Sequence, residues 1–330
     1  MCTALAFHAK DNYFGRNLDF DFDFGQQVLI TPRKFEFTFK QAKKTVPQHY
    51  AMIGMGIVVD NYPLYFDATN EKGLSMAGLY FSGNAVYRKE IANKDNIASF
   101  ELIPWILTQC TTIDEVKVLL QNINITDQAF NADYAPSPLH WLIADKKQSI
   151  VLESVEDGIK IYDNPTDVLT NNPPFPIQLF NLNQYRHCSS KIAENTFSKD
   201  IQLTEYSRGM GGIGIPGDLT STSRFARIAF IRANAFNNQK TEDEAVNQFF
   251  HILKSVEQQK GLCDIGGGVY EYTIYSSCCN ADKGIYYYTT YVNSQITAVD
   301  MYNEDLDSST IVNYPLILQE QIAHINAKKK

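Results

Sequence analysis

The chain has 330 residues, of which 44% are hydrophobic and 20% are charged, so it holds enough apolar side chain for a substantial core. Its formal net charge is −8, and its longest run of basic residues is the three lysines at 328–330, so we expect no nucleic-acid partner. No stretch of about 18 apolar residues occurs, and the first residues lack the basic and apolar regions of a signal peptide. We therefore expect no membrane partner and a cytoplasmic location.

The first part of the chain alternates short apolar runs with turns. Runs rich in β-branched and aromatic residues predict strands at 3–8, 13–19, 28–31, 50–59 and 75–80. The period then changes, because apolar residues recur every three or four positions and predict helices at 100–110 and 112–122. Thr112, followed by Asp114 and Glu115, is placed as the N-cap of the second helix.

The second half repeats this order of strands and helices. A meander is predicted between residues 140 and 165, with turns at 145–147 and 156–158, and it ends at a proline-rich segment. Helices are expected at 223–235 and 241–258, and strands at 270–276, 284–292 and 295–301. This order lacks the strict alternation of a parallel βαβ sheet, so we expect a layered α+β fold. It consists of two stacked, mainly antiparallel sheets covered by helices, in one domain over residues 1–330.

Two glycine-containing motifs resemble ligand-binding loops but lack the neighbouring residues that such loops need. Gly209, Gly211 and Gly214 form G-x-G-x-x-G, but Pro216 follows at once, so we interpret the run as an irregular loop. Residues 19–25 imitate a calcium loop, yet glycine falls one place late and Ile30 stands where a bidentate Glu is needed. A strand that runs into a loop, with rings on one face and carboxylates on the other, explains this segment better.

Histidine and cysteine spacing favours neither a metal site nor a disulfide framework. The six histidines include no H-E-x-x-H, and no G-x-S-x-G is present. We interpret His140 as a hydrogen-bonded interior histidine, with a place near a pocket as the alternative. The six cysteines are too sparse for a disulfide framework and show no C-x-x-C pair, so we expect reduced thiols, no metal and no cofactor.

Cys2 carries the strongest chemical signal. Removal of Met1 would leave a thiol and a free α-amine on one residue, with ordinary pKa values of about 8.5 and 7.7–8.0. Such a residue supplies both nucleophile and base. The alternative is that Cys2 is only the second residue of an opening strand. Arg16 and Asp19 argue against it, because a guanidinium lowers a thiol pKa and a carboxylate orients an amine if the two strands pair.

Blocks of sequence along nearly the whole chain carry a further signal. They include MCTALAF, YFGRNLDFDF, YPLYFDATNEKGLSMAGLYF, SPLHWLIADKKQSIVLES, VLTNNPPF and YSRGMGGIGIPGDLTSTSRF. In this order the chain resembles the cholylglycine hydrolase family of N-terminal-nucleophile hydrolases, which includes bile salt hydrolases and penicillin V acylases. The resemblance implies an αββα fold, often a homotetramer, and hydrolysis of a linear amide without metal or cofactor.

The resemblance also assigns roles to individual residues. It makes Cys2 the nucleophile, Arg16 and Asp19 its neighbours, Asn171 the oxyanion donor and Arg224 an active-site arginine. One position departs from the bile salt hydrolase pattern: after Ala-Gly-Leu the family usually has asparagine, whereas this chain has Tyr80, as penicillin V acylases do. The backbone N–H at this position can still serve the oxyanion, and the phenol reshapes the pocket.

The remaining blocks favour bile salts as substrate. Residues 206–210 and 261–288 resemble bile salt hydrolases of intestinal Gram-positive bacteria, so we expect cleavage of glycine- or taurine-conjugated bile acids, with penicillin V as the alternative. A lipid-binding module and an oxidoreductase built on the glycine run are the other classes considered. An apolar pocket is needed, and its candidate residues, for which core packing is the alternative, are Leu18, Phe22, Phe130 and Tyr134.

Overall fold

Two large antiparallel sheets form the centre of the molecule, a computed structural model that describes residues 1–326. The terminal lysines at 328–330 lie outside the described residues. The first sheet has the order β14 (Val168–Leu169), β1 (Cys2–His8), β2 (Asn12–Phe20), β17 (Tyr272–Asn280), β18 (Ile285–Thr290) and β19 (Asn293–Asp300). The second has the order β13 (Gly158–Asp163), β12 (Ser149–Val155), β11 (Leu139–Ala144), β8 (Ser75–Tyr80), β7 (Tyr62–Asn70), β6 (Met52–Val59), β3 (Gln27–Thr31) and β20 (Val312–Pro315).

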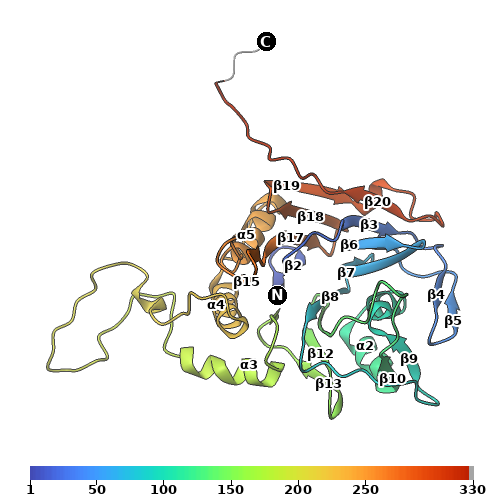
Figure 1. Cartoon of the computed structure of the whole chain (residues 1–330). Coiled ribbons are helices and arrows are strands. Elements are labelled where there is room, and N and C mark those ends of the chain that lie inside the picture. Colours follow the sequence, from blue (N-terminus) through green and yellow to red (C-terminus); the bar gives the residue numbers. More distant parts are fainter. Residues whose placement is uncertain (327–330) are drawn as a thin grey trace.

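Helices cover the outer faces of both sheets (Figure 1). On the first sheet lie α4 (Ser221–Asn234) and α5 (Glu242–Lys254), and on the second lie α1 (Leu102–Leu107) and α2 (Ile113–Leu119). A short helix, α3 (Phe175–Asn181), packs beside α4. Three small pairs complete the strands: β4 (Phe37–Phe39) with β5 (Lys44–Val46), β9 (Asp95–Ala98) with β10 (Ile123–Thr126), and β15 (Asp264–Gly266) with β16 (Val269–Tyr270).

The core is layered in the same way. One buried cluster fills the space between the sheets and beneath α4 and α5, and another lies between the second sheet and α1 and α2. Burial of apolar surface on both faces of each sheet stabilises the stack, because each sheet is too apolar to face water. The αββα sandwich expected from the sequence is confirmed.

Most predicted elements are found within a few residues. The N-cap at Thr112 is confirmed, because its side chain accepts from the backbone N–H of Glu115 at 3.3 Å. A second threonine, Thr241, caps α5 in the same way. Both helices begin with acidic residues, which suit the positive end of the helix dipole.

Several elements escaped prediction, most of them short strands, and two of them did so for clear local reasons. Strand β7 contains Pro63 and Asp67, which break the apolar alternation typical of a strand. Helix α3 starts in the proline-rich segment, where Pro174 is the N-cap and Pro176 sits in the first turn. Proline fits there because the first helical N–H groups need no partner, so a segment that predicted only a break also begins a helix.

The glycine run at 209–214 forms an irregular loop, as expected. Gly209 and Gly214 have φ of 82° and 103°, and no α-helix begins until Ser221. Residues 19–25 also follow the prediction, because β2 ends at Phe20 and the rings of Phe20, Phe22 and Phe24 gather with centroids 4.6–4.9 Å apart. All six cysteines are free thiols.

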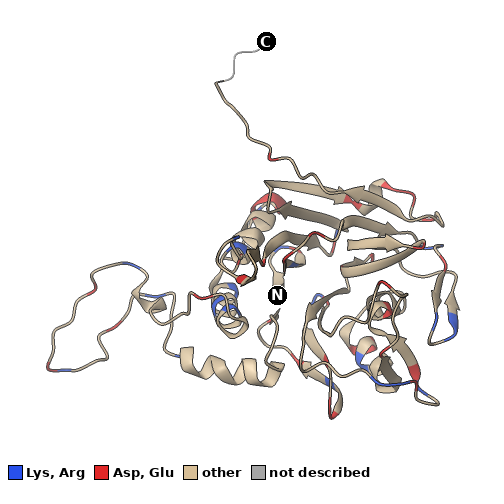
Figure 2. Ribbon diagram, in the orientation of Figure 1, with Lys and Arg blue, Asp and Glu red and all other residues tan. Residues whose placement is uncertain are grey.

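Charged residues are dispersed over the loops and helices, with both signs mixed (Figure 2). Among the described residues, no helix combines the length and apolar character needed to cross a bilayer.

Candidate active site

Cys2 is the first residue of β1, an interior strand of the first sheet. It pairs with Leu18 of β2 and is 4% exposed. Its side chain faces the second sheet, where a cavity of about 180 Å³, here called the thiol cavity, brings it together with Gly78 and Tyr80. The thiol therefore opens into a space between the two sheets that is mostly apolar.

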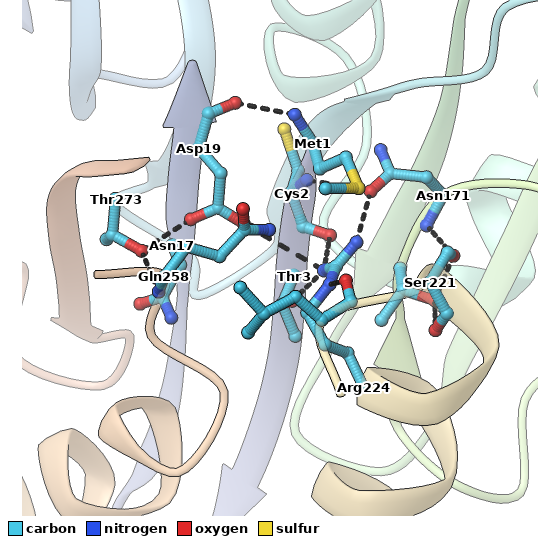
Figure 3. Close-up of polar contacts among 12 residues, drawn as sticks. Met1, Cys2, Thr3, Asn17, Asp19, Asn171, Ser221, Arg224, Gln258 and Thr273 are labelled. Atoms are coloured by element: carbon cyan, nitrogen blue, oxygen red, sulfur yellow. Dashed lines mark hydrogen bonds and ion pairs between the residues drawn. The ribbon is translucent and has the colours of Figure 1, made fainter. Parts of the chain in front are cut away.

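Met1 extends the pairing of β1 with β2 by one residue, and its peptide bond to Cys2 makes the Cys2 nitrogen an amide. Its carbonyl accepts from the Asp19 N–H at 2.9 Å, and its ammonium group donates to the Asp19 carbonyl at 2.7 Å. The same ammonium group forms an ion pair with Glu271. The Cys2 nitrogen is an amide in this form and donates to Asn171 Oδ1 at 2.7 Å (Figure 3). An amide nitrogen has no basic lone pair, so Cys2 has no α-amine while Met1 is present.

Asn171 is held in one orientation by four contacts. Its Oδ1 also accepts from Arg224 Nη2 at 2.8 Å, and its Nδ2 donates to the Tyr80 carbonyl at 2.7 Å. Its backbone N–H donates to Ser221 Oγ at 2.8 Å. If the side-chain amide of Asn171 were flipped, its nitrogen would face two N–H donors. These hydrogen bonds therefore determine which atom of the amide is oxygen and which is nitrogen. One hydrogen of the amide nitrogen goes to Tyr80, and the other faces no acceptor among the described residues.

Arg224 joins the Cys2 backbone to Asn171 from the helical side. Its guanidinium is fully buried and donates to the Leu219 carbonyl at 3.0 Å, to the Cys2 carbonyl at 2.6 Å and to the Thr3 hydroxyl (Figure 3). Burial lowers the pKa of Arg224, against the opposing effect of Asp19, whose carboxylate lies 3.9 Å away. Arginine stays charged even so, and Arg224 acts as a fixed positive group beneath the nucleophile.

Asp19 lies on the opposite face of β2 from the residues that line the thiol cavity. Its Oδ1 accepts from the Thr273 hydroxyl at 2.6 Å and its Oδ2 from Gln258 Nε2 at 3.0 Å. Residues 16 and 19 are an odd number of positions apart on one strand, so their side chains point to opposite faces. The expected pairing of β1 with β2 is confirmed, but the two charged neighbours of Cys2 occupy different sides of the sheet.

Arg16 lies on the cavity side with much of its guanidinium unpaired. It is 1% exposed, and its Nη1 donates to the Gly78 carbonyl at 2.6 Å and the Phe66 carbonyl at 3.1 Å. Its Nε and Nη2 have no partner among the described residues. Burial alone would lower the pKa of Arg16, but negative charge on Cys2 and nearby Asp67 outweighs it and raises the pKa. Arg16 thus presents a permanent charge and free donors beside the thiol.

The backbone of Tyr80 offers a second donor to the thiol cavity. The Phe81 N–H donates to the Pro138 carbonyl at 2.8 Å, across the β8–β11 pair. Peptide groups of adjacent residues alternate between the two edges of a strand, so both the N–H and the carbonyl of Tyr80 point away from β11. On that edge the carbonyl meets Asn171, and the phenol is 41% exposed.

A second apolar cavity of about 160 Å³, the side cavity, adjoins the thiol cavity. The predicted pocket residues are divided between them, with Leu18 in the thiol cavity and Phe130 and Tyr134 in the side cavity. Phe22 lines neither cavity; it is half-exposed, and its ring contacts those of Phe20 and Phe24. The two cavities share residues that sequence reasoning did not single out: Phe24, Tyr65, Phe66, Ser137 and Leu139.

Other residues of the site were also missed. Gln258 and Thr273 hold Asp19, and Glu271 binds the ammonium group of Met1, yet all three are more than two hundred positions from the N-terminus. No local pattern marks such residues, since only the pairing of β17 with β2 brings them near.

An αββα sandwich with a cysteine at the start of an interior strand is the architecture of N-terminal-nucleophile hydrolases. A family model described as linear amide C–N hydrolases, choloylglycine hydrolase family, matches residues 2–314. The bile salt hydrolase/transferase of Lactiplantibacillus plantarum is 53% identical, over 99% of this chain and 100% of the relative. The bile salt hydrolase/transferase of Clostridium perfringens is 39% identical, over 99% and 100%.

Solved structures agree with these sequence matches. The C2A mutant of conjugated bile acid hydrolase from Clostridium perfringens superposes with a TM-score of 0.91 at 37% identity, covering 99% of this chain and all of that one. The penicillin V acylase of Agrobacterium tumefaciens shares the fold, with a TM-score of 0.72 at 18% identity over 94% and 90%. The chain belongs to the choloylglycine hydrolase family and is a hydrolase of linear amide C–N bonds.

Proposed function

We propose that this protein is a bile salt hydrolase that cleaves the amide of glycine- or taurine-conjugated bile acids, with Cys2 as nucleophile after removal of Met1. The observation that carries the proposal is the position of the Cys2 thiol in an apolar cavity, between the free donors of Arg16 and the Tyr80 backbone. The names of the relatives supply the substrate class, and the C2A mutant supplies a matching cysteine at position 2 of one relative.

The reaction proceeds through a thioester. The Cys2 α-amine takes the thiol proton, the thiolate attacks the amide carbonyl, and the C–N bond breaks as the amine returns that proton to the leaving nitrogen. Water then attacks the thioester, releases the bile acid and restores the thiol. Asn171 Oδ1 already accepts from the Cys2 nitrogen, so it orients the new α-amine toward this role.

The oxyanion of both tetrahedral intermediates lies, in this proposal, between the Tyr80 N–H and the remaining amide hydrogen of Asn171. These groups are linked by the Nδ2 to carbonyl bond of 2.7 Å, so their separation is fixed before substrate binds. Loss of one such donor typically costs about 2.7–4 kcal/mol of transition-state stabilisation. Arg16 holds the thiolate and the entering acyl group from the other side, and no cofactor takes part.

The two adjoining cavities accommodate the acyl part of the substrate. Aromatic and aliphatic side chains line both, which suits a rigid apolar steroid more than a polar acyl group. Leu18, the strand partner of Cys2, lines the thiol cavity, and Phe130 and Tyr134 line the side cavity. Phe22 lines neither cavity, but its ring contacts those of Phe20 and Phe24, which do.

The substrate is tested by comparing release of glycine from glycocholate, taurine from taurocholate and phenoxyacetate from penicillin V. We expect the bile conjugates to give the higher kcat/KM. Cys2→Ala should abolish turnover and keep the fold, whereas Cys263→Ala, which changes a partly exposed thiol, should keep activity. Full activity of the Cys2→Ala variant would refute the assignment.

Penicillin V acylase activity is the second candidate, and Tyr80 favours it. Its phenol borders the thiol cavity and offers a ring to an aromatic acyl group. If this ring selects the substrate, Tyr80→Asn raises the ratio of bile conjugate to penicillin V cleavage. An unchanged ratio would reject Tyr80 as the selector and leave the backbone N–H as its only contribution.

We further propose that the enzyme acts in the bacterial cytoplasm as a single-domain homotetramer. The loop between α3 and α4 supports association, because it projects from the sandwich (Figure 1) and exposes Ile192, Phe197 and Tyr206 by 73–82%. Light scattering coupled to size-exclusion chromatography should give four subunits. Serine at all three positions should shift the protein toward smaller species.

A further inference from the structure

His140 and Glu153 form a buried pair beside the active site that the proposed mechanism does not use. Both side chains are fully buried, on the neighbouring strands β11 and β12. His140 Nδ1 lies 3.1 Å from Glu153 Oε1, and His140 Nε2 lies 2.8 Å from the Thr170 carbonyl. The same Glu153 oxygen accepts from the Phe175 N–H at 2.9 Å.

These contacts define how the pair is hydrogen-bonded. His140 Nε2 faces a carbonyl oxygen, which can only accept, so this nitrogen carries a proton and donates to Thr170. His140 Nδ1 and Glu153 Oε1 then share one proton, and their contact is satisfied whichever of the two atoms holds it. Burial of two ionisable side chains is a costly way to gain stability alone, because their lost hydration offsets much of what the contact between them contributes. The location of the pair indicates a different benefit.

The ring of His140 touches two chain segments that are ninety positions apart. It stacks on Phe81 with centroids 4.1 Å apart and planes 6° from parallel. Through Nε2 it also holds the Thr170 carbonyl. Phe81 follows Tyr80 directly, and Thr170 precedes Asn171. The segment around Asn171 is held on its other side by Glu153, through the backbone of Phe175.

We propose that His140, hydrogen-bonded to Glu153, is a positioning residue that fixes the Tyr80 segment relative to the Asn171 segment and so sets the geometry of the oxyanion site. The inference rests on the proposed function, because it takes these two segments as the source of the oxyanion donors. His140 itself touches no substrate and acts through its two neighbours. We call His140 and Glu153 together the His140 clamp.

His140→Phe tests the clamp with little change of shape. Phenylalanine keeps the ring that stacks on Phe81 but cannot donate to Thr170. We expect kcat to fall about 100-fold, the scale of a 1 Å misplacement of a catalytic group, with little change in KM. Alkylation of Cys2 by iodoacetamide needs the thiolate but no oxyanion site, so its rate should match that of wild type.

Glu153→Gln provides a second variant in case His140→Phe does not fold. The glutamine oxygen can still accept from the Phe175 N–H, but it carries no proton for His140 Nδ1, so a neutral ring can keep only one of its two contacts. We expect a kcat loss of about 10-fold. The rate of Cys2 alkylation should stay at the wild-type value, which a general loss of packing around the site would not produce.

His49 supplies a matched control in the same chain. It is also buried, and its two ring nitrogens face the carbonyls of Tyr50 and Phe35 at 2.7 and 2.8 Å. It borders a different cavity, with Arg33 and Glu71. His49→Phe should therefore lower the melting temperature and leave kcat of the folded protein unchanged.

Hydrogen exchange provides a readout that does not depend on turnover. The clamp predicts faster amide exchange at residues 78–82 and 168–175 in the His140→Phe and Glu153→Gln variants, and no change there in His49→Phe. Wild-type protein that cleaves none of the three amides would contradict the proposed function alone. Unchanged kcat in the folded clamp variants, alkylation that falls as far as kcat, or unchanged exchange in the two segments would overturn the clamp.

Discussion

The two buried arginines of the active site lie on opposite faces of the first sheet and differ in how completely they are bonded. Arg224, on the helical side, donates to four acceptors, two of which belong to Cys2 and Asn171. Arg16, on the cavity side, uses one nitrogen, and its other two have no partner among residues 1–326. A buried donor without a partner costs about 1–3 kcal/mol, so a fold retains it only where another need exists.

This difference in hydrogen bonding indicates that Arg224 has a structural role and Arg16 a catalytic role. The contacts of Arg224 are fulfilled within the chain, so its removal should damage the structure around Cys2. The free N–H groups of Arg16 face the thiol cavity, so its removal should damage the reaction more than the fold. The following predictions test that separation.

Arg224→Met should have the largest effect. It removes the donors to the Cys2 carbonyl and Asn171 and leaves the Asp19 carboxylate buried without its nearest cation. Breaking a buried ion pair in this way costs about 3–5 kcal/mol of unfolding free energy, which urea denaturation measures. Arg227→Met, one turn along the same helix, is the control and should cost much less, since Arg227 binds only loop carbonyls. Equal losses in the two variants would contradict the account.

Arg16→Met should lower kcat/KM by about 100-fold, as loss of a charged donor at the reacting group does in other enzymes. Its unfolding free energy should stay within about 1 kcal/mol of wild type, because relief of two unpaired buried N–H groups offsets the two lost backbone contacts. Steady-state kinetics and urea denaturation on the same sample decide the question. If Arg16→Met lowered the unfolding free energy as much as Arg224→Met does, the two arginines would not differ in their structural role.

Thr273→Val examines the helical face by a smaller change. It removes the hydroxyl that donates to Asp19 Oδ1 at 2.6 Å. A hydrogen bond to a buried carboxylate contributes about 1.5–3 kcal/mol, so the melting temperature should fall while kcat changes little. A large loss of kcat at an unchanged melting temperature would show that Asp19 has a catalytic role and not a structural one.

Asp67→Asn examines the cavity face through pH and should have the smallest effect. Burial raises the pKa of Asp67 above its ordinary 3.8, although Arg16 and the hydroxyls of Tyr286 and Tyr275 oppose it. The native state therefore binds more protons than the unfolded state from pH 3.8 up to that raised pKa.

Across this window the wild-type unfolding free energy falls as pH rises, and the contribution is lost in full above the native pKa. Urea denaturation at successive pH values should show this decline in wild type relative to Asp67→Asn. If the unfolding free energies of the two proteins changed with pH in parallel, the pKa of Asp67 would be the same in the folded and unfolded states.

The helices that form the outer layers were predictable because the spacing of apolar residues along a helix is a local property of the sequence. Apolar spacing located α1, α2, α4 and α5, and Thr112 and Thr241 marked two of their starts. Strand β7 and helix α3 were missed because their prolines and Asp67 act against the local pattern, and only tertiary packing restores them.

The site was predictable in membership but not in geometry. Family blocks identified Cys2, Arg16, Asp19, Asn171 and Arg224. Pairing of β1 with β2 brings the first three together, and hydrogen bonds join Asn171 and Arg224 to Cys2. Sequence did not indicate that the amide oxygen of Asn171 binds the Cys2 nitrogen, nor that Glu271 holds Met1. Such facts depend on the pairing of β17 with β2 and of β14 with β1, which forms only in the folded chain.

The most direct test of the central claim is mass spectrometry of the active protein, acid-quenched during turnover of glycocholate. We predict a chain that begins at Cys2, with a cholyl group attached by a thioester to the peptide that contains Cys2. Full activity in protein that retains Met1, or an acyl group on any other residue, would contradict the account.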